Sequence, residues 1–175
     1  MRKLRYHVAC TLDGFIAHPD GSFGGFVAEG DHVTDFLASY ASYDTVLMGR
    51  KTYEVGLAVG VTDPYPTMKP YVFSRTIERS PDPRVEIVAE GAGDLVRMLK
   101  DRPGKDIWLC GGAELAGSLF DEGLIDEVVV KLNPRIFGSG IPLVAGGERR
   151  VSLELRQAKV YGSGVVLLTY AVSAP

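Results

Sequence analysis

The chain alternates between short apolar runs and segments in which apolar residues recur every three or four positions. The apolar runs predict strands, because they are rich in β-branched and aromatic residues and are bounded by turn residues. Strands are expected at residues 5–11, 15–17, 45–48, 71–73, 85–89, 107–109, 125–132, 151–161 and 165–172. The helical spacing predicts four helices, which begin at Asp31 as the N-cap residue, at Lys51, at Gly93 and after Gly112.

The order of these elements predicts one α/β domain that covers residues 1–175. Strands separated by helices pair in parallel and need cover on both faces of the sheet, which explains the unbroken apolar run Val128-Val129-Val130. The last two strands are joined only by Gly162-Ser163-Gly164, which is too short for a crossover and therefore predicts an antiparallel hairpin. The sheet is thus expected to be mixed but mainly parallel.

The composition is that of an ordinary globular protein. With 46% hydrophobic and 23% charged residues, disorder is excluded. A net charge of −3 provides no general attraction for nucleic acid or an anionic membrane, so any phosphate binding must be local. No apolar run approaches the roughly 20 residues that span a bilayer, and the basic start, residues 1–5, leads into a strand rather than a signal sequence. We therefore expect a cytoplasmic protein with no nucleic-acid or membrane partner.

Cysteine and histidine usage gives no sign of a metal site. Cys10 and Cys110 each end a strand pattern, where a small buried thiol fits. A disulfide between them stays open as an alternative, although nothing else in the sequence indicates secretion. The three histidines are scattered, and no Cys/His spacing typical of zinc occurs. Two buried free thiols and no metal are therefore expected.

Two strand-to-helix turns carry glycines of the kind that bind phosphate. Leu109-Cys110-Gly111-Gly112-Ala113-Glu114 joins an apolar strand to a helix, and Met48-Gly49-Arg50-Lys51-Thr52 does the same with two cations and a hydroxyl group. Glycine lets the backbone approach a bound anion, while the first N–H groups of the helix and its dipole face that anion. The alternative is that these glycines serve only tight packing.

A third strand ends in Ser74-Arg75-Thr76, so three strands are expected to finish with anion-binding groups at one sheet edge. Arg50 and Arg75 suit a phosphate monoester, because a guanidinium group donates two parallel hydrogen bonds to it. Thr52 and the Gly111-Gly112 amides suit a pyrophosphate. One monoester site plus one pyrophosphate site favours NADP(H) over NAD(H). The alternative is that both arginines are solvated surface residues.

Four motifs in this order resemble the dihydrofolate reductase-like superfamily, and within it the RibD C-terminal family, the reductase domain of bifunctional riboflavin-biosynthesis deaminase–reductases. They are Thr11-Leu12-Asp13-Gly14-Phe15-Ile16-Ala17, Leu47-Met48-Gly49-Arg50-Lys51-Thr52-Tyr53-Glu54, Cys110-Gly111-Gly112-Ala113-Glu114-Leu115, and Leu124-Ile125-Asp126-Glu127-Val128 followed by Asn133-Pro134-Arg135-Ile136-Phe137-Gly138-Ser139-Gly140-Ile141-Pro142-Leu143. The resemblance covers nearly the whole chain. The common dinucleotide fingerprint G-x-G-x-x-G, by contrast, does not follow the first strand.

The resemblance implies a three-layer α/β/α domain that works as an NADPH-dependent, homodimeric reductase. The adenosine phosphate, the pyrophosphate and the neighbouring ribose would meet residues at the three strand ends, namely Gly49, Arg50, Lys51, Thr52, Ser74, Arg75, Gly111, Gly112, Ala113 and Glu114. The nicotinamide and the substrate would be bordered by Ala9, Asp13, Ile16 and Ala17, with the loop at residues 137–140 near the rim. The resemblance implies, as the first candidate for the reaction, the reduction of 5-amino-6-(5-phosphoribosylamino)uracil.

The chain departs from that family where its members hold the ribose phosphate of the substrate. Their Trp-Ile-Thr and Leu-Thr-Val-Arg segments have no recognisable counterpart, and Phe26-Val27-Ala28 and the proline-rich residues 60–70 occupy these regions instead. The zinc deaminase motif is also absent from the sequence. The function therefore stays open between the phosphoribosylamino-uracil reductase, a dihydrofolate reductase-like enzyme with another pyrimidine- or pteridine-like substrate, and a non-catalytic nucleotide-binding dimer.

Reduction of a C=N or C=O group needs a proton as well as a hydride, and the sequence offers two carboxyl groups as the donor. Asp13 lies in the turn after the first strand, although Asp-Gly is also ordinary turn chemistry. Asp35 lies on the first helix beside Phe36, where a solvated position is the alternative. Water could also serve, and His32 is expected to be exposed rather than catalytic.

Overall fold

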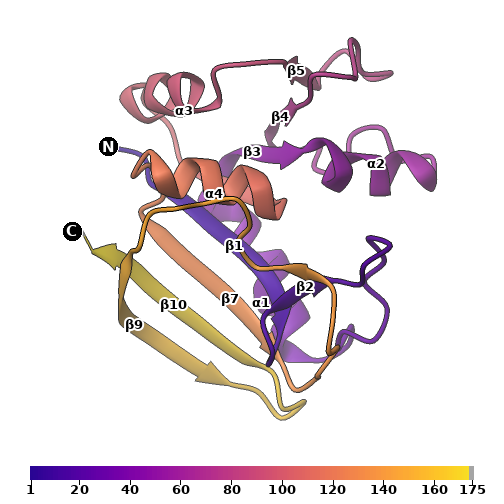
Figure 1. Cartoon of the computed structure of the whole chain (residues 1–175), viewed down its shortest axis with the longest axis vertical. Coiled ribbons are helices and arrows are strands. Elements are labelled where there is room, and N and C mark those ends of the chain that lie inside the picture. Colours follow the sequence, from indigo (N-terminus) through magenta and orange to yellow (C-terminus); the bar gives the residue numbers. More distant parts are fainter. Residues whose placement is uncertain (174–175) are drawn as a thin grey trace.

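The computed structural model describes residues 1–173, and within this range strands and helices alternate along the chain (Figure 1). The strands are β1 (Leu4–Thr11), β2 (Phe15–Ala17), β3 (Tyr43–Gly49), β4 (Lys69–Phe73), β5 (Glu86–Val88), β6 (Asp106–Gly111), β7 (Glu127–Asn133), β8 (Ile141–Pro142), β9 (Ser152–Val160) and β10 (Val166–Ser173). The helices are α1 (Asp31–Ser39), the 3₁₀ helix η1 (Tyr40–Ser42), α2 (Arg50–Ala58), α3 (Ala92–Asp101) and α4 (Ala113–Asp121).

Eight of these strands form one sheet in the order β5-β4-β3-β6-β1-β7-β10-β9, and β2 pairs with β8 separately. Every pairing from β5 to β7 is parallel. β10 runs antiparallel to both β7 and β9. The mixed, mainly parallel sheet and the C-terminal hairpin that the sequence predicts are therefore confirmed. In Figure 1 the hairpin of β9 and β10 forms one margin of the sheet, and β4 and β5 lie at the other.

Helices cover both faces of the sheet and give it three layers. On one face, α3 and α4 pack over a core that contains Leu47 of β3. On the other face, α1 and α2 pack over a second core that contains Val46 and Met48 of the same strand. Because successive side chains of a strand point to opposite faces, Leu47 belongs to one core, while its neighbours Val46 and Met48 belong to the other. This is why the apolar run in β3 is unbroken.

Trp108 lies at the centre of the core on the α1 face. Its ring centroid is 4.6 Å from that of Tyr65 and 5.7 Å from that of Phe36. Its indole Nε1 donates a hydrogen bond to the carbonyl oxygen of His7 at 2.9 Å. Buried aromatic rings supply large apolar areas, so this cluster holds both α1 and the loop at residues 60–70 against the sheet.

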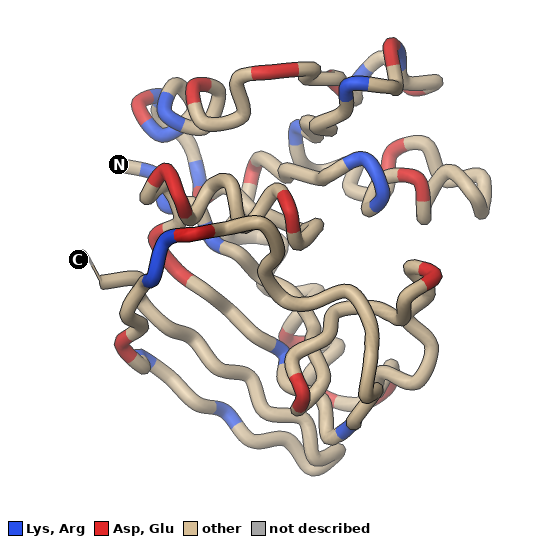
Figure 2. The backbone as a smooth tube through the Cα atoms, viewed as in Figure 1, with Lys and Arg blue, Asp and Glu red and all other residues tan. Residues whose placement is uncertain are grey.

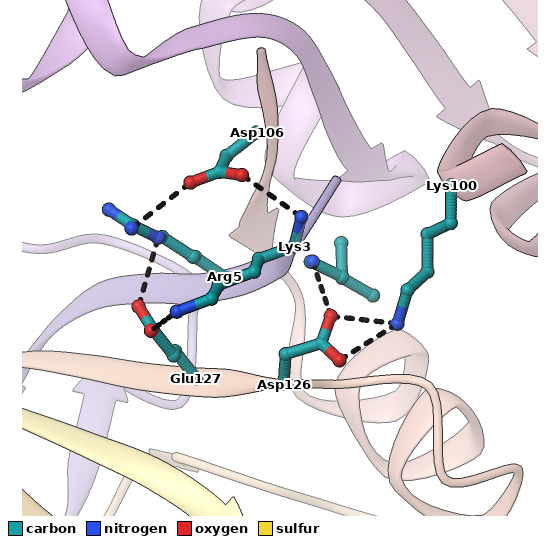
Figure 3. A network of polar contacts seen from close by, with 7 residues as sticks. Lys3, Arg5, Lys100, Asp106, Asp126 and Glu127 are labelled. Carbon is teal, nitrogen blue, oxygen red and sulfur yellow. Dashed lines mark hydrogen bonds and ion pairs between the residues drawn. The ribbon is translucent and has the colours of Figure 1, made fainter. Parts of the chain in front are cut away.

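Ion pairs lie at the end of the sheet where β1, β6 and β7 begin (Figure 3). The Arg5 guanidinium group lies 3.0 Å from the Asp106 carboxylate and 2.9 Å from the Glu127 carboxylate. Nearby, the Lys100 ammonium group lies 2.7 Å from the Asp126 carboxylate. The charged groups at this edge are thus paired with one another. Elsewhere Figure 2 shows acidic and basic residues interspersed along the trace, which agrees with phosphate binding that has to be local.

Two local features differ from the sequence-based expectation. The N-cap residue of α1 is Gly30 rather than Asp31, which becomes the first helical residue. Gly30 has a φ of 119°, a backbone conformation that side chains disfavour, so the helix entry requires glycine there. The pairing of β2 with β8 was not expected at all, because Ile141–Pro142 is too short to produce a readable alternation.

Both cysteines are free thiols on different faces of the sheet. Cys10 is buried in the core under α4, whereas Cys110 is partly buried and packs beside the core on the other face. Across residues 1–173, no helix is both long and apolar enough to cross a bilayer. The same range contains no cluster of three or more His, Cys, Asp or Glu side chains that could hold a metal ion.

Candidate functional site

Two glycine turns meet at the sheet edge opposite the ion pairs. The β3–β6 pairing places Met48 beside Gly111, so Gly49 and Gly112 follow side by side. A Cβ atom on Gly49 would lie 3.2 Å from the backbone nitrogen of Gly112. A Cβ atom on Gly111 would lie 3.3 Å from Thr52 Oγ1, and one on Gly112 would lie 3.6 Å from the same atom. These four residues therefore form one cradle whose floor stays open because three of them lack side chains.

Each glycine turn leads straight into a helix whose first N–H groups have no side-chain cap. Gly49 is the N-cap residue of α2 and Gly112 is that of α4. The N–H groups of the first helical turn have no partner inside a helix, and the positive end of the helix dipole reinforces them. Two such helix ends beside one cradle are suited to bind linked phosphate groups. The Gly111–Gly112 peptide bond in this cradle is cis.

The predicted loop Ser74-Arg75-Thr76 lies beside the Gly49 turn, because Phe73 of β4 pairs with Gly49 of β3. Ser74 is buried, and its Oγ accepts hydrogen bonds from the amides of Ile77 at 2.8 Å and Thr76 at 3.2 Å. This hydroxyl group thus shapes the turn that presents Arg75. The structure brings all three loops together at neighbouring strand ends, as the sequence predicts.

The cations of this region are available to an anion. Arg50 pairs with Glu54 one turn along α2, with an N–O distance of 2.8 Å, and both side chains are more than a third exposed. An exposed pair of this spacing contributes only about 0.3–0.5 kcal/mol, so a phosphate can replace the carboxylate at little cost. Arg75 is exposed, as is Lys51. These exposed cations thus lie on the two loops that follow the neighbouring strands β3 and β4.

The remaining residues of the predicted cofactor set lie on the same side of the molecule. Ala113 and Glu114 open α4, and the Ala113 carbonyl oxygen accepts a hydrogen bond from the Ala145 amide at 3.1 Å. Ala9 lies near the end of β1, whereas Ile16 and Ala17 lie on β2, after the Asp13 turn. Their assignment to the nicotinamide end of a cofactor stays a prediction.

Asp13 holds the rim loop in place. Its carboxylate accepts hydrogen bonds from Thr11 Oγ1 at 2.6 Å and from the amides of Gly138 at 2.7 Å and Phe137 at 3.1 Å. These donors, the Thr11 hydroxyl first among them, stabilise the charged form and lower the pKa of Asp13. A proton donor at neutral pH needs the opposite shift. The geometry therefore gives Asp13 the role of positioning residues 137–138.

Asp35 is also held in its charged form. Its carboxylate accepts hydrogen bonds from Lys159 Nζ and, at 2.6 Å, from Tyr161 Oη. These contacts, with Lys159 the larger cause, lower the pKa of Asp35. The partners come from β9 and the hairpin turn, which lie far along the chain from Asp35, so this contact could not be predicted from the sequence around it. Asp35 thus fastens α1 to the C-terminal hairpin.

The expectation that His32 is exposed is wrong. His32 is 3% exposed, and its ring nitrogens contact Ser163 Oγ at 3.2 Å and the Val27 carbonyl oxygen at 3.1 Å. The hairpin turn packs against the first turn of α1 and covers the ring. That long-range contact could not be read from the polar residues around His32 in the sequence.

A small cavity lies between α1 and the strands β1, β7 and β10. Its volume is about 40 Å³, and its polar lining comes from His7, His32, Asp35, Ser39, Lys131 and Tyr161. Burial is the main cause that lowers the pKa of His7 to about 4, so this ring is neutral at physiological pH. Lys131 was missed by the sequence analysis, although a lysine that interrupts the apolar run of residues 128–132 was a visible signal.

The chain is similar to known proteins over nearly its whole length. A family model described as the RibD C-terminal domain matches residues 2–167. The uncharacterized protein YwjB of Bacillus subtilis (strain 168) is 37% identical over 170 residues, which are 95% of this chain and 96% of YwjB.

Solved structures show the same fold. A Shewanella sp. PV-4 protein named for riboflavin biosynthesis superposes with a TM-score of 0.83 at 25% identity, over 99% of this chain and 100% of that chain. A Thermotoga maritima diaminohydroxyphosphoribosylaminopyrimidine deaminase/5-amino-6-(5-phosphoribosylamino)uracil reductase superposes with a TM-score of 0.73 at 18% identity, over 98% of this chain and 57% of that chain.

Proposed function

The chain belongs to the RibD C-terminal domain family, and from this premise we propose that it is an NADPH-dependent reductase of a pyrimidine- or pteridine-like compound. RibD C-terminal domains are reductase domains with the dihydrofolate reductase-like fold, and this chain has that fold. Membership of the family gives the reductase class, and the identities of the cofactor and of the substrate are what we propose.

The observation that carries the proposal is the cradle of Gly49, Thr52, Gly111 and Gly112. Its amides and the Thr52 hydroxyl group would hold the pyrophosphate of NADPH, with the first N–H groups of α2 and α4 directed at it. Arg50 and Arg75, together with Lys51, would hold the 2′-phosphate, which NADH lacks. This division of labour predicts a preference for NADPH over NADH.

When bound, the dihydronicotinamide ring supplies the hydride for reduction of a C=N or C=O group. The chain's own part is to orient the two planar groups and to keep water away from them. Ala9, Ile16 and Ala17 would border the nicotinamide. Asp13 would keep residues 137–138 at the rim through its bonds to their amides.

The substrate we put first is 5-amino-6-(5-phosphoribosylamino)uracil. The name of the Thermotoga maritima protein with the same fold includes reduction of this compound. A second candidate is another pyrimidine- or pteridine-like compound, and one observation favours it: Phe26-Val27-Ala28 and residues 60–70 replace the segments that hold the ribose phosphate in the riboflavin reductases. A chain that binds NADPH but reduces none of these compounds would be the non-catalytic alternative.

We further propose that the protein is a homodimer joined through β9. All nine residues of this strand are exposed, and β9 is an edge strand of the sheet. An exposed edge of this length is a site for pairing with another strand. If two copies pair antiparallel about Leu155, Glu154 of each copy lies opposite the partner's Arg156, so the charges of the strand complement themselves.

A cytoplasmic location completes the proposal. Cys10 and Cys110 are free thiols on different faces of the sheet, as is usual in a reducing compartment. NADPH would be drawn from the same compartment.

The function is tested by mixing the protein with NADPH and each candidate substrate and following the loss of reduced-nicotinamide absorbance. The proposal expects loss that depends on both the protein and the phosphoribosylamino-uracil. Loss with dihydrofolate alone would favour the second candidate. No loss with any pyrimidine or pteridine compound, although NADPH binds, would identify the non-catalytic alternative.

A further inference from the structure

Lys131 lies on β7 with its side chain under α1. Its ammonium group donates a hydrogen bond to the Val27 carbonyl oxygen at 2.9 Å. Within residues 1–173 it forms no ion pair with a carboxylate, and it lines the small cavity described above. A lysine ammonium group has three donors, so two of them remain for a further partner. A half-buried cation without a counter-ion is costly in a fold, which makes its presence here informative.

The sheet places Lys131 on β7, two strands away from β6, which leads into the cradle. Lys131 pairs directly with Ala9 of β1. On the other side of β1, Tyr6 pairs with Leu109 of β6, the strand that leads into the Gly111-Gly112 turn. Strands β6, β1 and β7 are thus parallel neighbours, each about 4.8 Å from the next, with Ala9 and Lys131 side by side on β1 and β7. A ligand whose phosphates lie on the glycines extends its ring toward β1 and Lys131.

The other titratable groups of this region are unsuited to give a proton at neutral pH. Asp13 and Asp35 are held as carboxylates by the donors around them. His7 is buried and neutral, and it has no proton to spare as an acid. Tyr161 donates its hydroxyl hydrogen to Asp35. Lys131 is the group in this part of the described chain that combines a removable proton with unused donors.

We propose that Lys131 is the proton donor of the reduction, and that its ammonium group contacts the heteroatom of the C=N or C=O group that is reduced. The inference rests on the proposed function. A bound reduced nicotinamide would supply the hydride to the carbon. As the π bond breaks toward the heteroatom, that atom would take its proton from the Lys131 ammonium group. The resulting amine regains its proton from water. A cavity of about 40 Å³ admits a single small group such as a carbonyl oxygen, because one water occupies about 30 Å³.

Burial favours this role because it lowers the pKa of Lys131 and brings it closer to physiological pH. The titratable groups that face the lysine are His7 from β1, His32 and Asp35 from α1, and Tyr161 from the hairpin turn. The charge of Asp35, the one carboxylate among them, is shared with Lys159 and Tyr161. Desolvation is therefore the dominant influence on Lys131.

The first test uses the ligand-free protein and needs no turnover. Each lysine is acetylated briefly with acetic anhydride over a range of pH, and the rate at Lys131 is read by peptide mass spectrometry. The midpoint for Lys131 should lie below the ordinary lysine value of 10.5. NADP⁺ together with the phosphoribosylamino-uracil, which cannot react with each other, should protect Lys131. A midpoint at or above 10.5, or labelling that is unchanged in the presence of both ligands, would overturn the inference.

The second test compares Lys131→Met and Lys131→Arg with Lys105→Met, a control at the exposed opposite edge of the sheet. Both Lys131 variants should bind NADPH as the parent does, while their single-turnover rate falls by about 10²- to 10⁴-fold. Arginine keeps the charge but cannot release a proton. Full activity in Lys131→Arg would show that only charge is needed and would refute proton donation, as would full activity in Lys131→Met. Failure of the parent protein to bind NADPH would instead count against the proposed function.

Discussion

A Cβ atom added to Gly49 would lie 3.2 Å from the backbone nitrogen of Gly112, although the two glycines belong to different strand-to-helix turns. The two backbones therefore approach each other closely, which brings the N-termini of α2 and α4 together in one cradle. It exists because β3 and β6 are parallel neighbours whose registers end at the same level. Neither glycine could be replaced without moving a side chain into the space that the proposal gives to the pyrophosphate.

Gly49→Ala should therefore weaken NADPH binding by roughly tenfold, because the added methyl group crowds the Gly112 amide. The backbone of Gly49 has a φ of −72°, so alanine brings no backbone strain, and the variant should still fold, with a free energy of unfolding lowered by about 1–3 kcal/mol through the crowding. Gly162→Ala is the control, since a Cβ atom there meets nothing within 4 Å. Equal NADPH affinity in the two variants would argue against the cradle as the pyrophosphate site.

Arg50→Ala and Arg75→Ala should each weaken NADPH far more than NADH. A lost hydrogen bond to a charged group costs about 1.5–3 kcal/mol, which corresponds to roughly 10- to 100-fold in Kd. Arg97→Ala on α3, where the arginine pairs with Asp94 and Glu122, is the matched control. If both cofactors lose affinity equally, the two arginines do not hold the 2′-phosphate.

Because of His7, the free energy of unfolding should decrease as the pH is lowered below 6.5. Its pKa is lowered from 6.5 to about 4 by burial, so between these values the unfolded chain binds a proton that the folded chain does not. The free energy of unfolding is therefore unaffected by His7 above pH 6.5 and decreases as the pH falls from 6.5 to 4, by about 3 kcal/mol in all. Urea unfolding of the parent and of His7→Leu across this range measures the effect. The variant should lack this part of the decrease, and parallel curves would contradict the assignment.

Leu155→Lys should separate the proposed dimer. Leu155 is 53% exposed on β9 and would face its own copy at the centre of the pairing, so two lysines would meet there. Light scattering should show a dimer for the parent and a monomer for the variant. Met98→Lys, on an exposed position of α3, should remain a dimer. A parent protein that is monomeric at high concentration would remove the β9 proposal.

The parts of the site that could be predicted from sequence are those set by local order. The turns at Gly49 and at Gly111-Gly112 can be recognised in the sequence, because an apolar strand, a glycine and a helical pattern follow one another within a few residues. Neighbouring parallel strands then bring such turns together at one edge. The fold class followed from the same order of elements.

The parts that could not be predicted depend on contacts between distant segments. Asp35 resembles a solvated helix residue until Lys159 and Tyr161 of the hairpin reach it. His32 is covered for the same reason. The sequence shows which residues can ionise, but the direction of a pKa shift is set by partners that only the folded chain supplies.

The central claim is that the cradle and its arginines bind NADPH, and titration of the protein with NADPH while nicotinamide fluorescence is followed tests it most directly. We predict a saturable change with one site per chain, and an affinity for NADH that is at least roughly tenfold lower. A fluorescence that rises only in proportion to added NADPH, or equal affinities for the two cofactors, would contradict the account.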